Sequence, residues 1–181
     1  MSQGDARSAL VVVASEAEPV LATWRRRFHS RSVERGLPPH LTVLFPFLPA
    51  ADLGDDVREE LRRLYAPLAS FVYELMSVET FPTTAWLAPS PAGPFLDLIA
   101  ITRAAYPQYP PYGDPQLVPV PHCTVGTDDA PRAVEEMARE LRAGLGPKLP
   151  IRCRADGLTL LEERPDGTWV TRATFPFEEA V

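Results

Sequence analysis

The chain of 181 residues contains only two cysteines, Cys123 and Cys153. Two thiols 30 positions apart do not indicate a disulfide framework. The three histidines and the two cysteines also do not form the closely spaced ligand pairs that are typical of zinc sites. We therefore expect neither a disulfide scaffold nor a bound metal, and no motif of the sequence calls for a cofactor.

Long apolar runs are also missing. No segment approaches the roughly 20 consecutive apolar residues that a membrane-spanning helix needs. The first seven residues are mostly polar, and residues 8–14 are too short for the apolar part of a secretory signal with its flanks. We therefore expect a cytoplasmic protein with no membrane partner.

Basic residues are fewer than acidic ones, and Lys148 is the only lysine. The 18 basic and 24 acidic residues give a net charge of -6, which provides no general attraction to a polyanion such as duplex DNA. Five arginines nevertheless crowd into one short segment: Arg25, Arg26, Arg27, Arg31 and Arg35. A solvated helix face is the simpler interpretation, and a local basic patch is the alternative.

The composition, 45% hydrophobic and 23% charged, is typical of a globular protein, and we expect one domain over residues 1–181 that acts as a monomer. Hydrophobic periodicity and turn signals predict a strand, helix, strand, helix, strand order in each half of the chain. This order indicates an α+β fold of two pseudo-repeat lobes, residues 8–80 and 81–181, with antiparallel-rich sheets around a central cleft. The predicted strands are 8–14, 40–45, 71–78, 84–87, 118–125, 151–161 and 168–177, and the predicted helices are 18–28, 52–64, 95–105 and 132–145.

The same short motif occurs once in each half. Residues 39–43 are Pro-His-Leu-Thr-Val, and residues 121–125 are Pro-His-Cys-Thr-Val. Both fall on predicted strands, so His40 and His122 occupy matching positions in the two halves. A duplication explains this match better than coincidence does, and each half then contributes one His-x-Thr strand to the cleft.

The side chains of this motif suit acid-base chemistry on a phosphate. On a strand, His40 and Thr42 share one face about 6 to 7 Å apart, as do His122 and Thr124. Two imidazoles that titrate near neutral pH can hold one neutral base and one protonated acid at the same time. Threonine hydroxyls can donate hydrogen bonds to phosphate oxygens. We therefore take these four side chains as the catalytic residues, and this chemistry needs no metal.

Residues 39–47, Pro-His-Leu-Thr-Val-Leu-Phe-Pro-Phe, and residues 121–125 resemble the two signature motifs of the two-histidine phosphoesterase superfamily, in its 2′-5′ RNA ligase-like branch. The resemblance implies a phosphodiesterase that hydrolyses 2′,3′-cyclic phosphates of nucleotides or RNA ends. It also implies that His40 protonates the leaving oxygen, that His122 activates water, and that Thr42 and Thr124 bind the phosphate.

The sequence departs from that pattern at one place. Some members carry a basic residue shortly after the second motif, whereas residues 126–129 here are Gly-Thr-Asp-Asp. This difference argues against RNA ligation and against long or highly charged substrates. Three alternatives stay open: a 2′-5′ oligonucleotide phosphodiesterase, an ADP-ribose cyclic phosphate phosphodiesterase, and a module that binds nucleotides or RNA ends without turnover.

Other candidate residues receive simpler interpretations. His29 lacks the motif, and we expect it at the surface. Cys123 points away from its neighbour His122 on a strand, so we expect a small core residue and not a nucleophile. Four aromatic residues near the motifs could stack on a base, but core packing is the simpler role for most of them: Phe45, Phe47, Phe81 and Trp86. The proline-rich segment 106–119 is either a plain connection or a lid whose tyrosines stack on a ligand.

Overall fold

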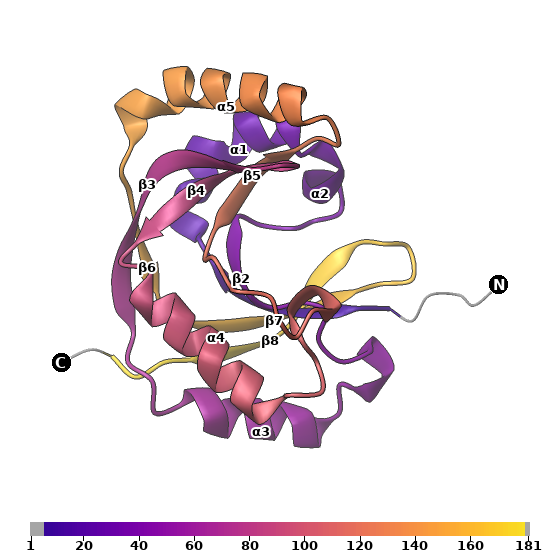
Figure 1. Cartoon of the computed structure of the whole chain (residues 1–181). Helices are drawn as coiled ribbons and strands as arrows, with labels where there is room; N and C mark the ends of the chain where they lie inside the picture. Colours follow the sequence, from indigo (N-terminus) through magenta and orange to yellow (C-terminus); the bar gives the residue numbers. More distant parts are fainter. Residues whose placement is uncertain (1–5, 180–181) are drawn as a thin grey trace.

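The computed structural model describes residues 6–179. Its eight strands are β1 (Ser8–Val13), β2 (His40–Leu44), β3 (Phe71–Phe81), β4 (Thr84–Ser90), β5 (Cys123–Thr127), β6 (Ile151–Ala155), β7 (Gly157–Glu163) and β8 (Trp169–Pro176). They form one sheet in the order β6-β3-β4-β5-β2-β1-β7-β8, and every neighbouring pair is antiparallel. The sheet curls into a half-barrel (Figure 1). The predicted α+β class with antiparallel sheet structure is confirmed.

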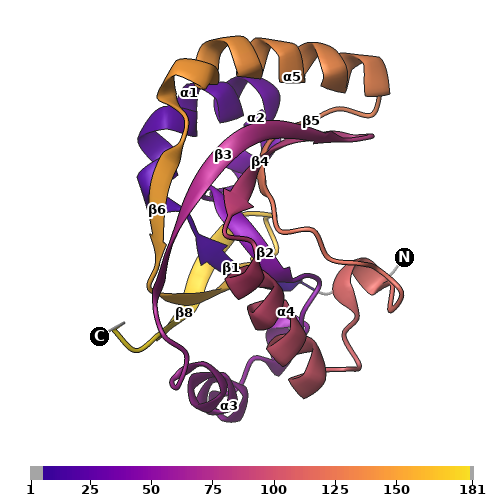
Figure 2. The ribbon, with the colours of Figure 1, turned by 60° about the vertical axis from the view of Figure 1, so that its left-hand side comes forward.

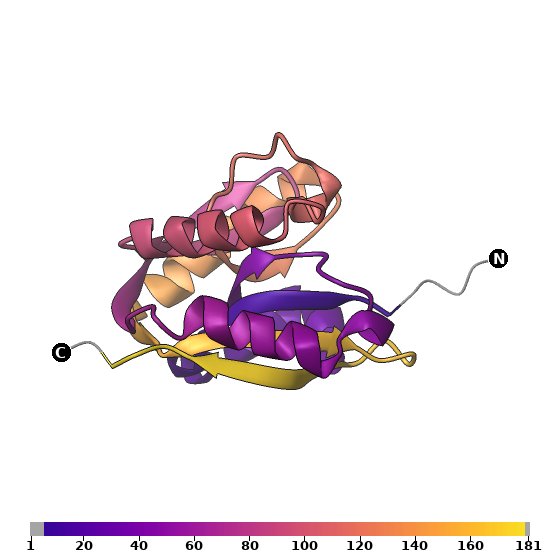
Figure 3. The same ribbon diagram turned by 90° about the horizontal axis from the view of Figure 1, so that it is seen from below.

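Helices flank this curled sheet. They are α1 (Glu18–Phe28), α2 (Ser30–Glu34), α3 (Asp55–Tyr65), α4 (Gly93–Ala105) and α5 (Pro131–Leu145). Helices α1 and α5 pack on the half that contains β3, β4 and β5, whereas α4 contacts β2 and α3 contacts β8 (Figures 1 and 3). Helix α2 packs on α1.

The apolar faces of the helices explain why they pack in this way. On α5, the buried side chains Val134, Met137, Ala138, Leu141 and Leu145 recur at helical spacing and join the main core. Truncation of a fully buried leucine in such a core, such as Leu141→Ala, costs about 2 to 5 kcal/mol. The proline at the start of α1 lies in the first turn, where its missing N–H breaks no helical hydrogen bond.

Most predicted elements are present, with three corrections. The strand expected over 118–125 begins only at Cys123, because prolines at 119 and 121 cannot donate hydrogen bonds to a sheet. The strand expected over 151–161 is two strands, β6 and β7, that separate at Asp156 and pair with different neighbours. The helix expected from residue 52 begins at Asp55, after a short 3-10 turn.

The halves of the sheet are assembled from distant parts of the chain. One half is β6-β3-β4-β5, and the other is β2-β1-β7-β8, so the C-terminal hairpin β7-β8 extends the half that holds the N-terminal strands. Figure 2 shows β3 and β6 rising together along one side of the half-barrel. The pseudo-repeat lobes 8–80 and 81–181 and the single domain over residues 1–181 stay predictions, and the latter extends beyond the described residues.

Candidate active site

The two motifs meet at the centre of the sheet. Strands β2 and β5 are neighbours, and their register pairs Leu41 with Cys123, the middle residues of the two His-x-Thr motifs. Continuing this antiparallel register by one residue in each direction places His40 beside Thr124 and Thr42 beside His122. Directly opposed side chains on one face have their Cβ atoms about 4.5 to 5.5 Å apart. Each imidazole therefore lies next to the threonine of the other motif, and this arrangement could not be read from either motif alone.

Both imidazole rings are fixed by the same backbone hydrogen bond. Nδ1 of His40 lies 2.7 Å from the carbonyl oxygen of Pro38, and Nδ1 of His122 lies 2.7 Å from that of Val120. A carbonyl only accepts, so Nδ1 must carry the proton in each ring. The described residues offer Nε2 of neither ring a hydrogen-bond partner. Nε2 of both rings is thus the nitrogen that can take up or release a proton.

Aromatic side chains hold the His122 ring. Phe81 and Trp86 both meet it edge to face, with ring centroids 5.1 Å and 5.8 Å from that of His122. Phe81 and Trp86 in turn stack on each other at 4.7 Å. Burial by these rings lowers the pKa of His122, although the hydrogen bond to the Val120 carbonyl opposes the shift.

The environment of His40 lowers its pKa further. Burial of the ring is the main cause, and the positive charges of Arg25 and His122 add to it, so the pKa of His40 falls to about 4. Arg25 itself is only 2% exposed and donates a hydrogen bond of 2.8 Å to the Leu37 carbonyl. The prediction that the arginine segment is a solvated face is therefore wrong for Arg25, because the inner face of α1 buries this side chain behind the motif strands.

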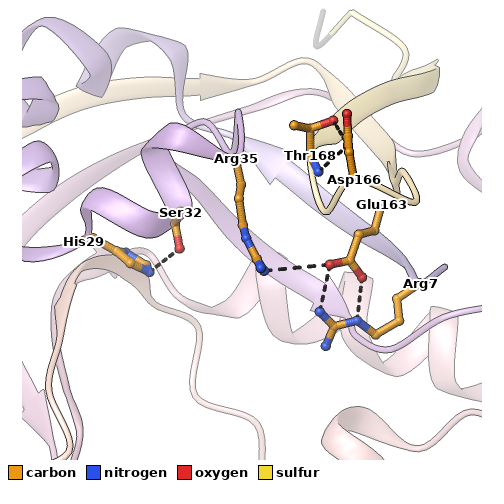
Figure 4. Close-up of polar contacts among 7 residues, drawn as sticks. All are labelled: Arg7, His29, Ser32, Arg35, Glu163, Asp166 and Thr168. Atoms are coloured by element: carbon orange, nitrogen blue, oxygen red, sulfur yellow. Dashed lines mark hydrogen bonds and ion pairs between the residues drawn. The ribbon is translucent and has the colours of Figure 1, made fainter. Parts of the chain in front are cut away.

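His29 also departs from its predicted surface position. Its Nε2 lies 2.6 Å from the hydroxyl of Ser32 (Figure 4), and its Nδ1 is buried without a hydrogen-bond partner. Burial, Arg25 and His40 together lower the pKa of His29 to about 4. The turn between α1 and α2 carries this ring inward, so it lies within electrostatic range of the first motif.

A cavity of about 420 Å³ opens at the motifs, and Thr42, His122 and Thr124 line it. His40 is half-buried and is not among the lining side chains, although it shares a face of β2 with Thr42. Thr84 of β4 adds a third threonine to the lining, and no sequence signal pointed to it. Apolar walls complete the cavity: Phe45, Phe81, Leu117, Val118 and Val120 are among them.

One wall comes from the proline-rich segment 106–119. Tyr112 in its short 3-10 turn has φ 52°, which is uncommon for a residue other than glycine. Its N–H donates a 2.6 Å hydrogen bond to the Phe45 carbonyl, and its hydroxyl interacts with Thr42. From outside, Arg103 donates hydrogen bonds to the carbonyls of Pro115 and Leu117. The segment is thus more than a plain connection, because it is held as part of the cavity.

Comparison with known families gives a match over most of the chain. Residues 13–167 match the family model of the 2′-5′ RNA ligase superfamily. The chain belongs to this superfamily.

Solved structures agree with this assignment at the level of the fold. LigT of E. coli complexed with 3′-AMP is 16% identical to the chain, with a TM-score of 0.62 over 95% of this chain and 98% of that one. TT0787 of Thermus thermophilus is 21% identical, with a TM-score of 0.59 over 94% and 97%. LigT complexed with NADP+ is 17% identical, with a TM-score of 0.59 over 96% and 98%. Comparison with curated proteins gives no match.

The structure also tests the simpler expectations for other residues of this member of the 2′-5′ RNA ligase superfamily. Cys123 is fully buried, and burial raises its pKa to about 12, so it is a core residue and not a thiolate nucleophile. Phe47 and Trp86 are likewise buried, while Phe45 and Phe81 face the cavity. Within residues 6–179, no group of three or more His, Cys, Asp or Glu side chains is arranged to hold a metal ion. Across the same residues, no helix is both long and apolar enough to cross a membrane.

Proposed function

We propose that the protein is a metal-independent phosphodiesterase that hydrolyses 2′,3′-cyclic phosphates of nucleotides or RNA ends. The observation that carries the proposal is the matched pair of hydrogen bonds from Nδ1 of His40 and His122 to backbone carbonyls. These bonds leave two Nε2 atoms, next to two threonine hydroxyls, for proton transfer at one phosphate.

The pKa shifts of the two histidines favour one assignment of general acid and general base, and it is the opposite of the assignment that the family resemblance implied. His40, with a pKa of about 4, is neutral near pH 7 and suits the general base. His122 lacks the contribution of Arg25 and is the easier ring to protonate, above all when a phosphate anion lies beside it. We therefore assign His40 as the base and His122 as the acid.

The proposed reaction balances as a single displacement at phosphorus. Nε2 of His40 takes a proton from water, and the water oxygen forms a bond to phosphorus. The bond from phosphorus to one ribose oxygen breaks, and Nε2 of His122 gives its proton to that oxygen. The hydroxyls of Thr42 and Thr124 hold the non-bridging oxygens, where charge is present throughout the reaction. The product is a nucleoside monophosphate.

All of these groups come from one chain, which supports a monomer as the active form. The proposed substrate is a small nucleotide or an RNA terminus, and the protein is proposed to meet it in the cytoplasm. LigT was crystallised with 3′-AMP, a nucleoside monophosphate of the class that this reaction would release.

A turnover screen tests the proposal. The wild-type protein is offered nucleoside 2′,3′-cyclic phosphates, 2′-5′ dinucleotides and ADP-ribose cyclic phosphate, and the products are separated by chromatography. We expect turnover of the 2′,3′-cyclic phosphates, with loss of at least about a hundredfold in His40→Ala and in His122→Ala. Thr42→Val and Thr124→Val should also lower turnover, and Thr80→Val is their matched control, because Thr80 bonds Glu135 at the surface. Tight nucleotide binding with no turnover of any of these substrates would instead establish a binding module.

A further inference from the structure

The cavity at the motifs has an unusual lining for a site that accepts a phosphate. None of the described residues that line it is Asp, Glu, Lys or Arg. Its polar side chains are hydroxyls and one imidazole: Thr42, Thr84, Thr124, Tyr112 and His122. This set can hold one phosphate diester, which carries a single negative charge, through neutral hydrogen bonds and a protonated His122.

Acidic residues lie beyond one end of the cavity. Thr84, which lines the cavity, pairs with Thr127, and the next residues are Asp128 and Asp129, which are exposed. Asp128 is held there by a hydrogen bond from its N–H to the Thr83 carbonyl. These carboxylates do not line the cavity, but they add negative charge to its surroundings, and like charges repel. The net charge of -6 adds no attraction at longer range.

Arginines approach the walls of the cavity, but none among the described residues lines it. The Arg7 guanidinium lies 5.3 Å from the centre of the Phe45 ring, so it is near one cavity wall. Its Nε and Nη2 donate to both carboxylate oxygens of Glu163, at 2.7 and 3.1 Å, and Arg35 approaches the same carboxylate at 3.9 Å (Figure 4). The Arg7 donors that face Glu163 are therefore engaged, although two arginines on one carboxylate leave one net positive charge outside the cavity. Arg103 is engaged in the same way by the carbonyls of Pro115 and Leu117.

The mouth of the cavity is apolar and exposed. Val118 is 79% exposed, Tyr112 is 54% exposed and Val120 is 46% exposed, and all three line the cavity. Folding gains nothing from leaving such side chains in water, whereas an apolar or aromatic ligand group would bury them. A nucleobase fits this description, because its faces are apolar and stack on tyrosine.

From these observations we infer that the site selects substrates in which the cyclic phosphate is the only charged group. A nucleoside 2′,3′-cyclic phosphate with a free 5′-hydroxyl has this form, and its base would lie against Tyr112, Val118 and Val120. Oligonucleotides, 5′-phosphorylated nucleotides and pyrophosphate-containing cyclic phosphates do not have it. The inference rests on the proposed phosphodiesterase function and narrows its substrate class.

Substrates with one and with two phosphate groups test the inference. They are adenosine 2′,3′-cyclic phosphate, the same compound with a 5′-phosphate, and a diadenylate that ends in a 2′,3′-cyclic phosphate. We expect kcat/KM to be at least about tenfold lower for each of the two compounds with a second phosphate group, mainly through KM, because the added charge weakens binding more than it alters the chemistry. Removal of the base, as in 1-O-methylribose 2′,3′-cyclic phosphate, should also lower kcat/KM at least about tenfold.

A positive charge introduced at the mouth of the cavity should weaken the selection against the 5′-phosphorylated substrate. Val118→Arg places a positive charge beside the cavity and should raise kcat/KM for the 5′-phosphorylated substrate relative to the unphosphorylated one, by about fivefold or more. Val118→Gln changes size without charge and should not alter that ratio. Val72→Arg adds the same charge at 39% exposure near the far end of β3, and should also leave the ratio unchanged.

The outcomes separate the inference from the function it rests on. Equal or faster turnover of the 5′-phosphorylated substrate would overturn the inference while confirming the phosphodiesterase. If the wild type preferred the 5′-phosphorylated substrate and Arg7→Gln abolished this preference, Arg7 would bind the 5′-phosphate, and the inference would be wrong. Absence of turnover on every 2′,3′-cyclic phosphate would remove the proposed function itself.

Discussion

Acidification should destabilise the protein through His40, and the size of the effect can be worked out. A histidine has an unfolded pKa near 6.5, and in the folded protein that of His40 is about 4. Because the folded pKa is the lower one, the unfolded chain takes up the proton first. The stabilising contribution is therefore complete above about pH 6.5 and is lost as the pH falls toward about 4. Between about pH 7 and pH 5 the loss is about 2 kcal/mol.

Comparison of the wild type with His40→Asn isolates this contribution. An asparagine amide can still donate to the Pro38 carbonyl, but it does not titrate. Urea unfolding followed by tryptophan fluorescence at about pH 7, 6 and 5 gives the free energy of unfolding of each protein. The wild type should lose about 2 kcal/mol more than the variant over this range. His29→Asn should likewise lose less free energy than the wild type, because burial, Arg25 and His40 lower the pKa of His29 to about 4.

A clear result would refute the reasoning. If wild type and His40→Asn lost the same free energy between about pH 7 and pH 5, to within about 0.5 kcal/mol, His40 would have an ordinary pKa in solution. The assignment of His40 as the neutral base would then be wrong, whereas the two-histidine mechanism would not be contradicted.

The remaining predictions concern catalysis and packing. Turnover should survive excess EDTA, since both proton transfers come from imidazoles; loss of activity that a divalent metal restores would contradict the mechanism. The pH profile of kcat/KM should be bell-shaped. It should rise near pH 4 as His40 deprotonates, and it should fall as His122 deprotonates, at a pH below the ordinary histidine pKa of 6.5. A steady rise of kcat/KM into alkaline pH would count against a general acid. A double His40→Ala, His122→Ala variant should be little slower than either single variant. Thr42→Val and Thr124→Val should each cost about 1 to 3 kcal/mol in transition-state binding. A near wild-type kcat/KM in one of these variants would show that the replaced side chain is not needed. Gly126→Ala should lower the free energy of unfolding by about 1 to 3 kcal/mol, because a Cβ there would collide with Met137 and Phe28, and unchanged urea unfolding would mean that these helices can shift.

Local signals were sufficient for most of the fold. The apolar spacing along residues 132–145 and the proline near the start of α1 predicted helices close to their observed bounds. Between the predicted strands 151–161 and 168–177, residues 164–167 read Arg-Pro-Asp-Gly, which is a turn signal. The β7-β8 hairpin turns there, and Gly167 has a positive φ of 81°. The predicted strand boundaries were wrong where the pairing partner sets them. At Asp156, for example, the apolar run stops pairing with β3 and its continuation pairs with β1.

The sequence by itself determined which side chains could do chemistry, because a repeated His-x-Thr motif places an imidazole and a hydroxyl on one face of any strand. Only the tertiary structure decided what surrounds them. The register of β2 against β5 sets His40 beside Thr124, the packing of α1 buries Arg25 behind His40, and segment 106–119 brings Tyr112 to Thr42. These residues are separated by 15 positions for Arg25 and His40, 70 for Thr42 and Tyr112, and 84 for His40 and Thr124. The pKa values depend on such neighbours and on burial, which periodicity along the chain does not encode.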